Sequence, residues 1–220
     1  MVVAALLSST GSASAEPAGP FLAASVGGGE LGDAPPGLTG GGLGLRGHLE
    51  VGYGDGRFIG GALSLALARA DYTNRVPPPE TIQPDADLRL TRVGFGAVVE
   101  GRLPLGRLTP SVGLGVYLDR LSAKAGGARL GIRGDYFATS DVAVGAELRA
   151  GLDLRVHPVV QIGARAGWSW SRADLGELTA GADWLAGPWL ELRVTFDASG
   201  FRMGSSNASA PPGASAKLGL

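Results

Sequence analysis

The charged side chains of this chain are spaced so that many of them could share one enclosed place. Between residues 142 and 156, Glu147, Arg149, Asp153 and Arg155 all stand at odd positions, and the even positions are apolar. Residues two apart on an extended chain point to the same side. Because unpaired buried charges are costly, such side chains should form Arg–carboxylate pairs.

The same spacing in other segments extends this predicted network. Its expected members are Arg46, His48, Glu50, Arg92, Glu100, Arg102, Asp119, Glu147, Arg149, Asp153, Arg155, Arg165, Glu191 and Arg193. Two roles are open. The network fills the interior as a structural plug, or it forms a gate in which re-pairing opens a narrow water path.

Other chemistries have weaker support. His48 and His157 are the only histidines, and a metal site needs several convergent ligands. Asp71, Asp85 and Asp87 lack the spacing of a calcium loop. No serine has an evident pairing with His48, so we expect no metal, no cofactor and no enzymatic activity. A lipid-modifying enzyme with a serine, histidine and acid remains an alternative.

Two glycine runs match the pattern G-x-G-x-x-G. They are Gly27, Gly29, Gly32 and Gly42, Gly44, Gly47. A dinucleotide site needs a strand before the glycines and a helix after them, whereas Pro35-Pro36 follows the first run and a strand pattern the second. We expect these glycines to relieve crowding or kink strands.

Period-two alternation predicts eight β-strands, and helical periodicity is weak throughout. The clearest strand covers residues 142–156. The others are expected at residues 20–29, 43–53, 58–72, 92–103, 111–119, 160–171 and 189–196. Short turns after the second, fourth and sixth strands alternate with longer loops at residues 30–42, 73–85, 122–138 and 172–181. This alternation is typical of an up-and-down membrane barrel, with both chain ends in the periplasm.

The composition of the two strand faces predicts which one meets lipid. The charged face is otherwise rich in Gly, Ala and Ser, which suits the narrow interior of an eight-stranded barrel. Turning Glu147, Arg149, Asp153 and Arg155 outward would cost on the order of 10 kcal/mol. We therefore predict an all-β, eight-stranded antiparallel transmembrane barrel with its apolar face outward.

Aromatic side chains are expected to form belts where the barrel meets the two membrane surfaces. Mid-strand Phe95 fits neither belt. The predicted belt residues are Phe21, Tyr53, Phe58 and Phe196 on the turn side, and Tyr72, Trp168, Trp170 and Trp184 on the loop side.

The two ends of the chain suggest export. Ala13-Ser14-Ala15 resembles a signal-peptidase site after an apolar stretch, so residues 1–15 are expected to be a signal peptide, truncated before its basic region. Residues 16–196 would form the barrel, and the polar residues 197–220 a disordered periplasmic tail. A net charge of −1 gives no footprint for nucleic acid.

The segment from Trp189 to Phe196, with alternating apolar residues and a final Phe, resembles the last strand of bacterial outer-membrane β-barrels. Over roughly residues 20 to 196 the pattern is similar to small barrels of the OmpA, OmpX and OmpW type. This resemblance implies outer-membrane localisation and recognition of the last strand by the barrel-insertion machinery. The tail after Phe196 departs from the family pattern.

The expected function is structural or interactive: a lipid-embedded scaffold whose four loops meet an unknown extracellular partner. The alternative from another class is a narrow channel or transporter for small polar or hydrophobic solutes.

Overall fold

The computed structural model describes residues 19–31, 44–54, 58–73, 85–129, 132–173, 175 and 184–198. The predicted signal peptide and the predicted tail beyond Ala198 lie outside these residues.

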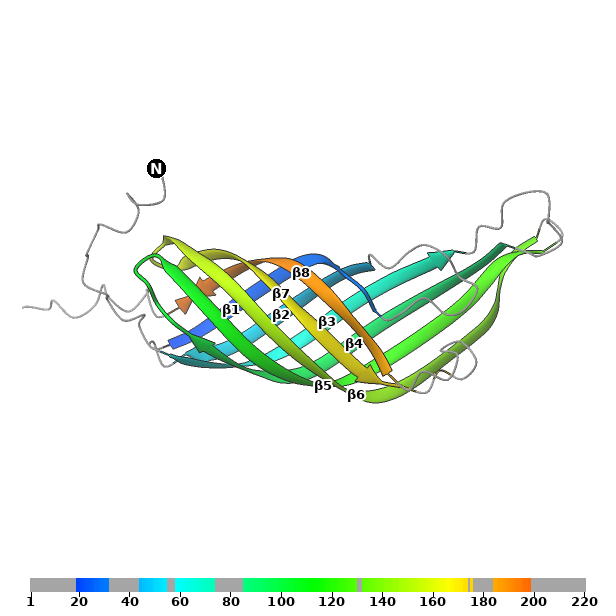
Figure 1. Cartoon of the computed structure of the whole chain (residues 1–220), viewed down its shortest axis with the longest axis horizontal. Coiled ribbons are helices and arrows are strands. Elements are labelled where there is room, and N and C mark those ends of the chain that lie inside the picture. Colours follow the sequence, from blue (N-terminus) through cyan, green and yellow to red (C-terminus); the bar gives the residue numbers. More distant parts are fainter. Residues whose placement is uncertain are drawn as a thin grey trace, which may run out of the picture.

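Eight antiparallel strands close into one barrel in sequence order, with β1 pairing β8 (Figure 1). Each strand pairs with the strand before and after it, which is the up-and-down topology. The predicted fold is therefore confirmed. The strands are β1 (Gly19–Gly29), β2 (Gly44–Gly54), β3 (Ile59–Thr73), β4 (Asp85–Arg102), β5 (Leu108–Arg129), β6 (Ile132–His157), β7 (Val160–Arg172) and β8 (Trp184–Asp197).

Side chains alternate between the two faces of the wall, as a pleated strand requires. Leu114, Val116 and Leu118 on β5 are 60% or more exposed, whereas the intervening Tyr117 and Asp119 are at most 1% exposed. The same division holds on β6, where Val144 is exposed and Glu147 is buried. The apolar side chains therefore face outward and the charged ones face inward over this part of the barrel.

Four neighbouring strands, β3 to β6, continue past the rest of the wall, and β3 pairs with β4 out to Thr73 and Asp87. Residues 122–138, predicted as a loop, are almost entirely strand, so that prediction is wrong. The pairing of β5 with β6 runs out to Arg129 and Ile132, whereas β6 first pairs with β7 at Gly145. With the outer ends of β3 and β4, the outer parts of β5 and β6 form a projection on the loop side of the barrel (Figure 1).

The polarity of the two faces reverses towards the loop end, although the alternation continues. On β3 the outward positions change from Leu67 to Arg69 and Asp71, while Tyr72 points inward. On β5 they change from Leu118 to Arg120 and Lys124, while Leu121 points inward. An outward face with charges suits water, so this end of the wall lies beyond the hydrocarbon.

A tight turn joins β4 to β5 at the other end of the barrel. Leu105 and Leu108 form a single β-bridge across it. Between them Gly106 has a φ of 69°, a left-handed conformation that is unfavourable for residues with a Cβ. In the described part of the chain, no helix is long and apolar enough to cross a membrane.

Candidate functional site

The interior of the barrel holds balanced opposite charges. Five arginines are buried, and Arg102 joins them with a side chain that is 11% exposed. Six carboxylates are buried with them, so the set is neutral before His48 is counted. The arginines are Arg46, Arg92, Arg102, Arg149, Arg165 and Arg193, and the acids are Glu50, Glu100, Asp119, Glu147, Asp153 and Glu191.

Glu50 is at the centre of the network. Its carboxylate accepts hydrogen bonds from Arg149 Nη1, from Arg165 Nη1 at 3.1 Å and from Arg193 Nη2 at 2.9 Å. These three arginines come from β6, β7 and β8, whereas Glu50 is on β2. One carboxylate therefore connects β2 across the lumen to β6, β7 and β8, none of which is its neighbour in the wall.

Glu100 and Asp153 complete the charge balance around these arginines. Arg165 Nη2 donates to Glu100 Oε1 at 2.7 Å, and Arg102 Nη2 donates to Glu100 Oε2 at 2.9 Å. Arg193 Nη1 donates to Asp153 Oδ2 at 3.3 Å. Four cations thus share three carboxylates, so this group already has one excess positive charge, and removing any one acid would increase that excess.

His48 precedes Glu50 by two residues on β2, nearer the loop end, and contacts two acids. Its Nδ1 is 2.9 Å from Glu191 Oε2, and its Nε2 is 3.5 Å from Glu147 Oε2. Arg46 bridges the same two acids, with Nη2 2.7 Å from Glu147 Oε2 and Nε 3.2 Å from Glu191 Oε1. The Arg46 guanidinium also lies 4.7 Å from the centre of the Trp189 ring, a cation–π distance.

A third group adjoins the loop end of the network. Arg92 Nε is 2.9 Å from Asp119 Oδ1, and Ser171 Oγ donates to Asp119 Oδ2 at 2.6 Å. The Arg92 guanidinium lies 5.2 Å from the Tyr117 ring. Each charged group therefore has a polar or aromatic neighbour, as burial requires.

Inward-facing glycines make room for these long side chains. A Cβ on Gly113 would lie 3.2 Å from Arg149 Nε, one on Gly115 2.7 Å from Tyr117 Cε2, and one on Gly151 2.9 Å from Arg165 Cγ. Larger residues at these positions would displace the side chains that pair across the interior.

Apolar side chains close both ends of the charged interior. On the loop side a buried cluster contains Leu31, Ala68, Ala70, Tyr72, Leu88, Leu90, Leu121, Ala123, Ala143, Ala173, Leu175 and Leu185; we call it the apolar cap. On the turn side Phe21 packs with Ala23 and Ala62, and the Arg102 guanidinium lies 4.8 Å from its ring.

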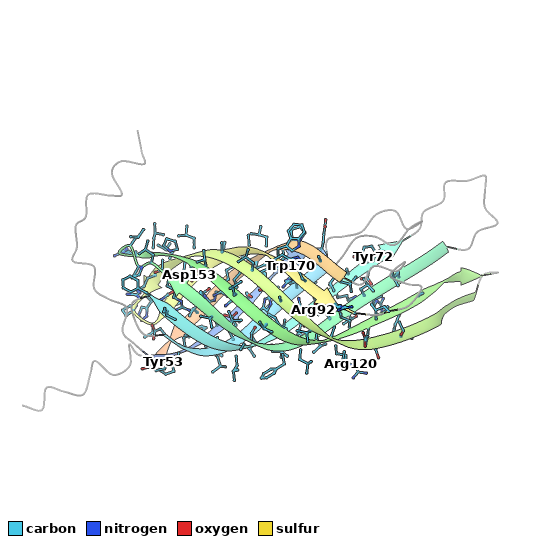
Figure 2. The ribbon with its side chains drawn as sticks, turned by 60° about the horizontal axis from the view of Figure 1, so that its bottom comes forward. Tyr53, Tyr72, Arg92, Arg120, Asp153 and Trp170 are labelled. Atoms are coloured by element: carbon cyan, nitrogen blue, oxygen red, sulfur yellow. The ribbon has the colours of Figure 1, made fainter. Side chains whose placement is uncertain are left out.

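Most of the residues expected in the network lie inside the barrel. Thirteen of them form ion pairs within it; Figure 2 shows Asp153 and Arg92 among the side chains. The fourteenth, Arg155, is half-buried beside an irregularity in the pairing of β6 with β7 near the turn.

Some of the predicted belt residues face outward and others face the interior. Tyr53, Phe58 and Phe196 are exposed towards the turn end, and Trp168 is 43% exposed and Trp170 half-buried on the loop side (Figure 2). The prediction is wrong for Phe21 and Tyr72, which are 6% and 1% exposed and point inward. Trp184 begins β8, and its side chain lies outside the described residues.

Sequence reasoning missed Ser25 as a member of the network. Ser25 pairs in register with His48, and its Oγ donates to Glu191 Oε2 at 2.5 Å. The ambiguous phase of β1, whose residues are nearly all small or apolar, hid this position. Alternation counted forward from an inward Phe21 places Ser25 inward, but the belt prediction had Phe21 outward.

The candidate metal ligands and the glycine runs can be located in part. Among the described residues, no three His, Asp or Glu side chains are arranged to hold a metal ion. Gly27, Gly29, Gly44 and Gly47 lie on β1 and β2, which pair with each other. The remaining glycines of the two G-x-G-x-x-G runs, Gly32 and Gly42, lie outside the described residues.

The outer surface explains why the charges are inside. Large apolar side chains that are exposed on all eight strands form a band around the barrel, and hydrocarbon is the environment that such a band requires. The lumen behind it is charged. The geometry is that of a barrel that crosses a membrane.

The chain matches no protein-family model and no curated protein sequence. Solved structures to which it is similar, at low identity, include the following three. Neisserial surface protein A is 16% identical (TM-score 0.45), covering 81% of this chain and 96% of that one. Ail of Yersinia pestis, in complex with the heparin analogue sucrose octasulfate, is 18% identical (TM-score 0.44), covering 81% of this chain and 99% of that one. CarO of Acinetobacter baumannii is 12% identical (TM-score 0.41), covering 80% of this chain and 96% of that one.

Proposed function

We propose that this chain, a small eight-stranded barrel of the bacterial outer membrane, is a closed anchor that presents a β-projection at the cell surface. In this proposal its lumen conducts neither ions nor solutes and its role is structural or interactive. In this proposal the barrel holds the projection in place because β3, β4, β5 and β6 run continuously from the wall into it.

The observation that carries the closed state is the burial of the charged side chains. Glu50, Glu191 and Arg193 are each 1% exposed, although the middle of a conducting lumen would be water-filled. Charges reached by water would show larger exposed fractions. The apolar cap on the loop side and Phe21 on the turn side add a second closure at each end.

Planar-bilayer conductance tests this closure. We expect wild-type protein to give no current steps above bare lipid, because the apolar cap, the charged network and Phe21 each fill the lumen at a different height. We expect the same of Arg149→Ala, because the apolar cap and Phe21 remain. A general porin in the same bilayers is the positive control. Current steps in wild type that change in size or frequency in Arg149→Ala would establish the gate instead.

The surface role rests on the shape and polarity of the loop side. The projection extends two paired strands beyond the last pair that β6 forms with β7. Its outer face carries the exposed side chains of Arg120, labelled in Figure 2, and of Lys124, which suits contact with water or polar partners. We propose that an extracellular partner meets the protein there.

Cysteine labelling tests the orientation that this role needs. The chain has no cysteine, so single substitutions report one position each. We expect Lys124→Cys to react with a membrane-impermeant maleimide on intact cells. Arg107→Cys, in the exposed turn between β4 and β5, should react only after the outer membrane is permeabilised. The opposite pattern would place the projection in the periplasm and remove the proposed role.

The proposed absence of catalysis is supported by the arrangement around His48. Ser25 and His48 both contact Glu191 Oε2, so the carboxylate lies between the two groups. A nucleophilic serine needs the histidine itself as its hydrogen-bonding base.

We also propose that the barrel-insertion machinery binds β8, whose apolar side chains face outward up to Phe196.

A further inference from the structure

We propose that the outer wall of β1–β5 binds one phosphorylated lipid of the outer leaflet, with its phosphate on a cationic cluster and an acyl chain in a groove below. The cluster comprises Arg69, Arg89, Arg120 and Lys124. The proposal needs the loop end of the barrel to face outward, and it does not depend on whether the lumen conducts.

The cationic cluster is continuous across three neighbouring strands. Arg69 on β3 stands opposite Thr91 on β4. Arg89 on β4 stands opposite Lys124 on β5. Arg120, two residues before Ser122, stands opposite Val93. All four cations are exposed on the outer face, and Figure 2 shows Arg120 pointing away from the barrel.

One carboxylate organises part of this cluster without neutralising it. Asp71 Oδ2 accepts from Arg69 Nε at 3.0 Å, and Asp71 Oδ1 accepts from Arg89 Nε at 2.9 Å. Four cations and one carboxylate leave an excess of three positive charges among these side chains. The hydroxyls of Thr91 and Ser122, which are opposite each other, add donors for phosphate oxygens.

A groove in the apolar band begins directly below the cluster. Its outward walls are Val26, Leu45, Leu67 and Val93, and Arg69 and Thr91 form its upper rim. Gly47 is the floor, because it stands between Val26 and Leu67 in the register and has no side chain to fill the space. An arginine above an apolar furrow at the membrane surface matches a lipid with an anionic head and a hydrocarbon tail.

The groove is the reason to prefer a lipid to a soluble polyanion. A soluble sulfated or phosphorylated sugar would use the cations alone and would gain nothing from the apolar walls. With the loop end facing outward, the apolar band would contact the acyl chains of outer-leaflet lipids, and the cluster at its upper edge would face their phosphates. Attraction of an anionic headgroup by each basic side chain near the surface is worth ~1 kcal/mol, so several together select a phosphorylated lipid.

Native mass spectrometry of the full chain in detergent, titrated with diphosphoryl lipid A, tests the site. We expect the triple variant Arg69→Gln, Arg89→Gln, Arg120→Gln to bind at least about tenfold more weakly. Arg107→Gln, at the opposite end, is its matched control. We expect Val26→Trp, which fills the groove over Gly47, to weaken binding also. Its control is Leu65→Trp, an outward position outside the groove.

The outcomes separate lipid from other ligands. Equal lipid A binding by wild type and the triple variant would overturn the proposal. Sucrose octasulfate serves as a soluble polyanion. If the triple variant loses both ligands while Val26→Trp binds lipid A like wild type, the cluster is a soluble-polyanion site and the lipid is wrong. Should the triple variant not fold, Arg120→Gln alone is compared with Arg107→Gln, with a smaller loss expected.

Discussion

Glu50→Ala is expected to be among the most destabilising single substitutions in the barrel. Three arginines donate to this carboxylate, and without it four cations would share only Glu100 and Asp153. Breaking a buried pair by removing one partner typically costs ~3–5 kcal/mol, because the remaining charge stays buried. We expect a clear fall in the urea midpoint, followed by tryptophan fluorescence of the protein in lipid vesicles.

Two matched variants decide whether the charge is the cause. Glu50→Gln keeps the shape and one acceptor oxygen but removes the charge, so its loss should be intermediate. Asp71→Ala removes an ion-paired carboxylate whose side chain is about half exposed, so it should cost ~1 kcal/mol or less. If Glu50→Ala lowers the midpoint no more than Asp71→Ala does, the network does not stabilise the barrel in the way its geometry indicates.

Gly27→Ala is expected to disrupt the pairing that closes the barrel. Gly27 on β1 stands opposite Glu191 on β8. A Cβ there would collide with the carbonyl oxygen of Leu190 and would lie 2.6 Å from the Cα of Glu191. Both contacts are with backbone, so the two strands would have to separate. We expect a cost at or above the ~1–3 kcal/mol usual for overpacking.

Gly28→Ala is the matched control for this closure. A Cβ on Gly28 would meet only the carbonyl oxygen of Gly44, at 3.5 Å, an ordinary contact. Folded barrels run faster than unfolded chains on gels without boiling, so the folded fraction of each variant can be measured directly. We expect a reduced folded fraction for Gly27→Ala and the wild-type fraction for Gly28→Ala. Equal fractions would mean that the β1–β8 pair tolerates a side chain.

The inward direction of the charged face in the membrane-spanning strands was predictable, because charged side chains that face the acyl chains would be too costly. On β6 the positions of Glu147, Arg149 and Asp153 alternate with apolar residues, and only one phase keeps charges out of hydrocarbon. The individual partners were not predictable. Which carboxylate meets Arg193 depends on the register and tilt of four strands, and alternation within one strand does not contain that information.

The errors at Tyr72 and at residues 122–138 share one physical cause. Prediction assumed that apolar side chains face outward along the whole strand, but beyond Leu67 and Leu118 the outward face carries Arg69 and Arg120. In that part the apolar side chains pack together inside, as in a water-soluble protein. An outward phase therefore predicts Tyr72 in a belt, and the charged outward face of residues 122–138 hides their strand pattern and predicts a loop. Phe21 failed for another reason, because β1 has too few charges to fix its phase.

The reversal of polarity also fixes how deep the barrel lies in the bilayer. Sinking by one pleat, two residues or about 6–7 Å, would draw Arg69 and Arg120 into the acyl chains. Each would then cost up to ~2–4 kcal/mol, depending on how far it moved towards the midplane. Rising by the same step would lift Leu67, Val93 and Leu118 into water. The protein therefore has one preferred depth of insertion in the bilayer, which is set by the outward side chains of its own wall.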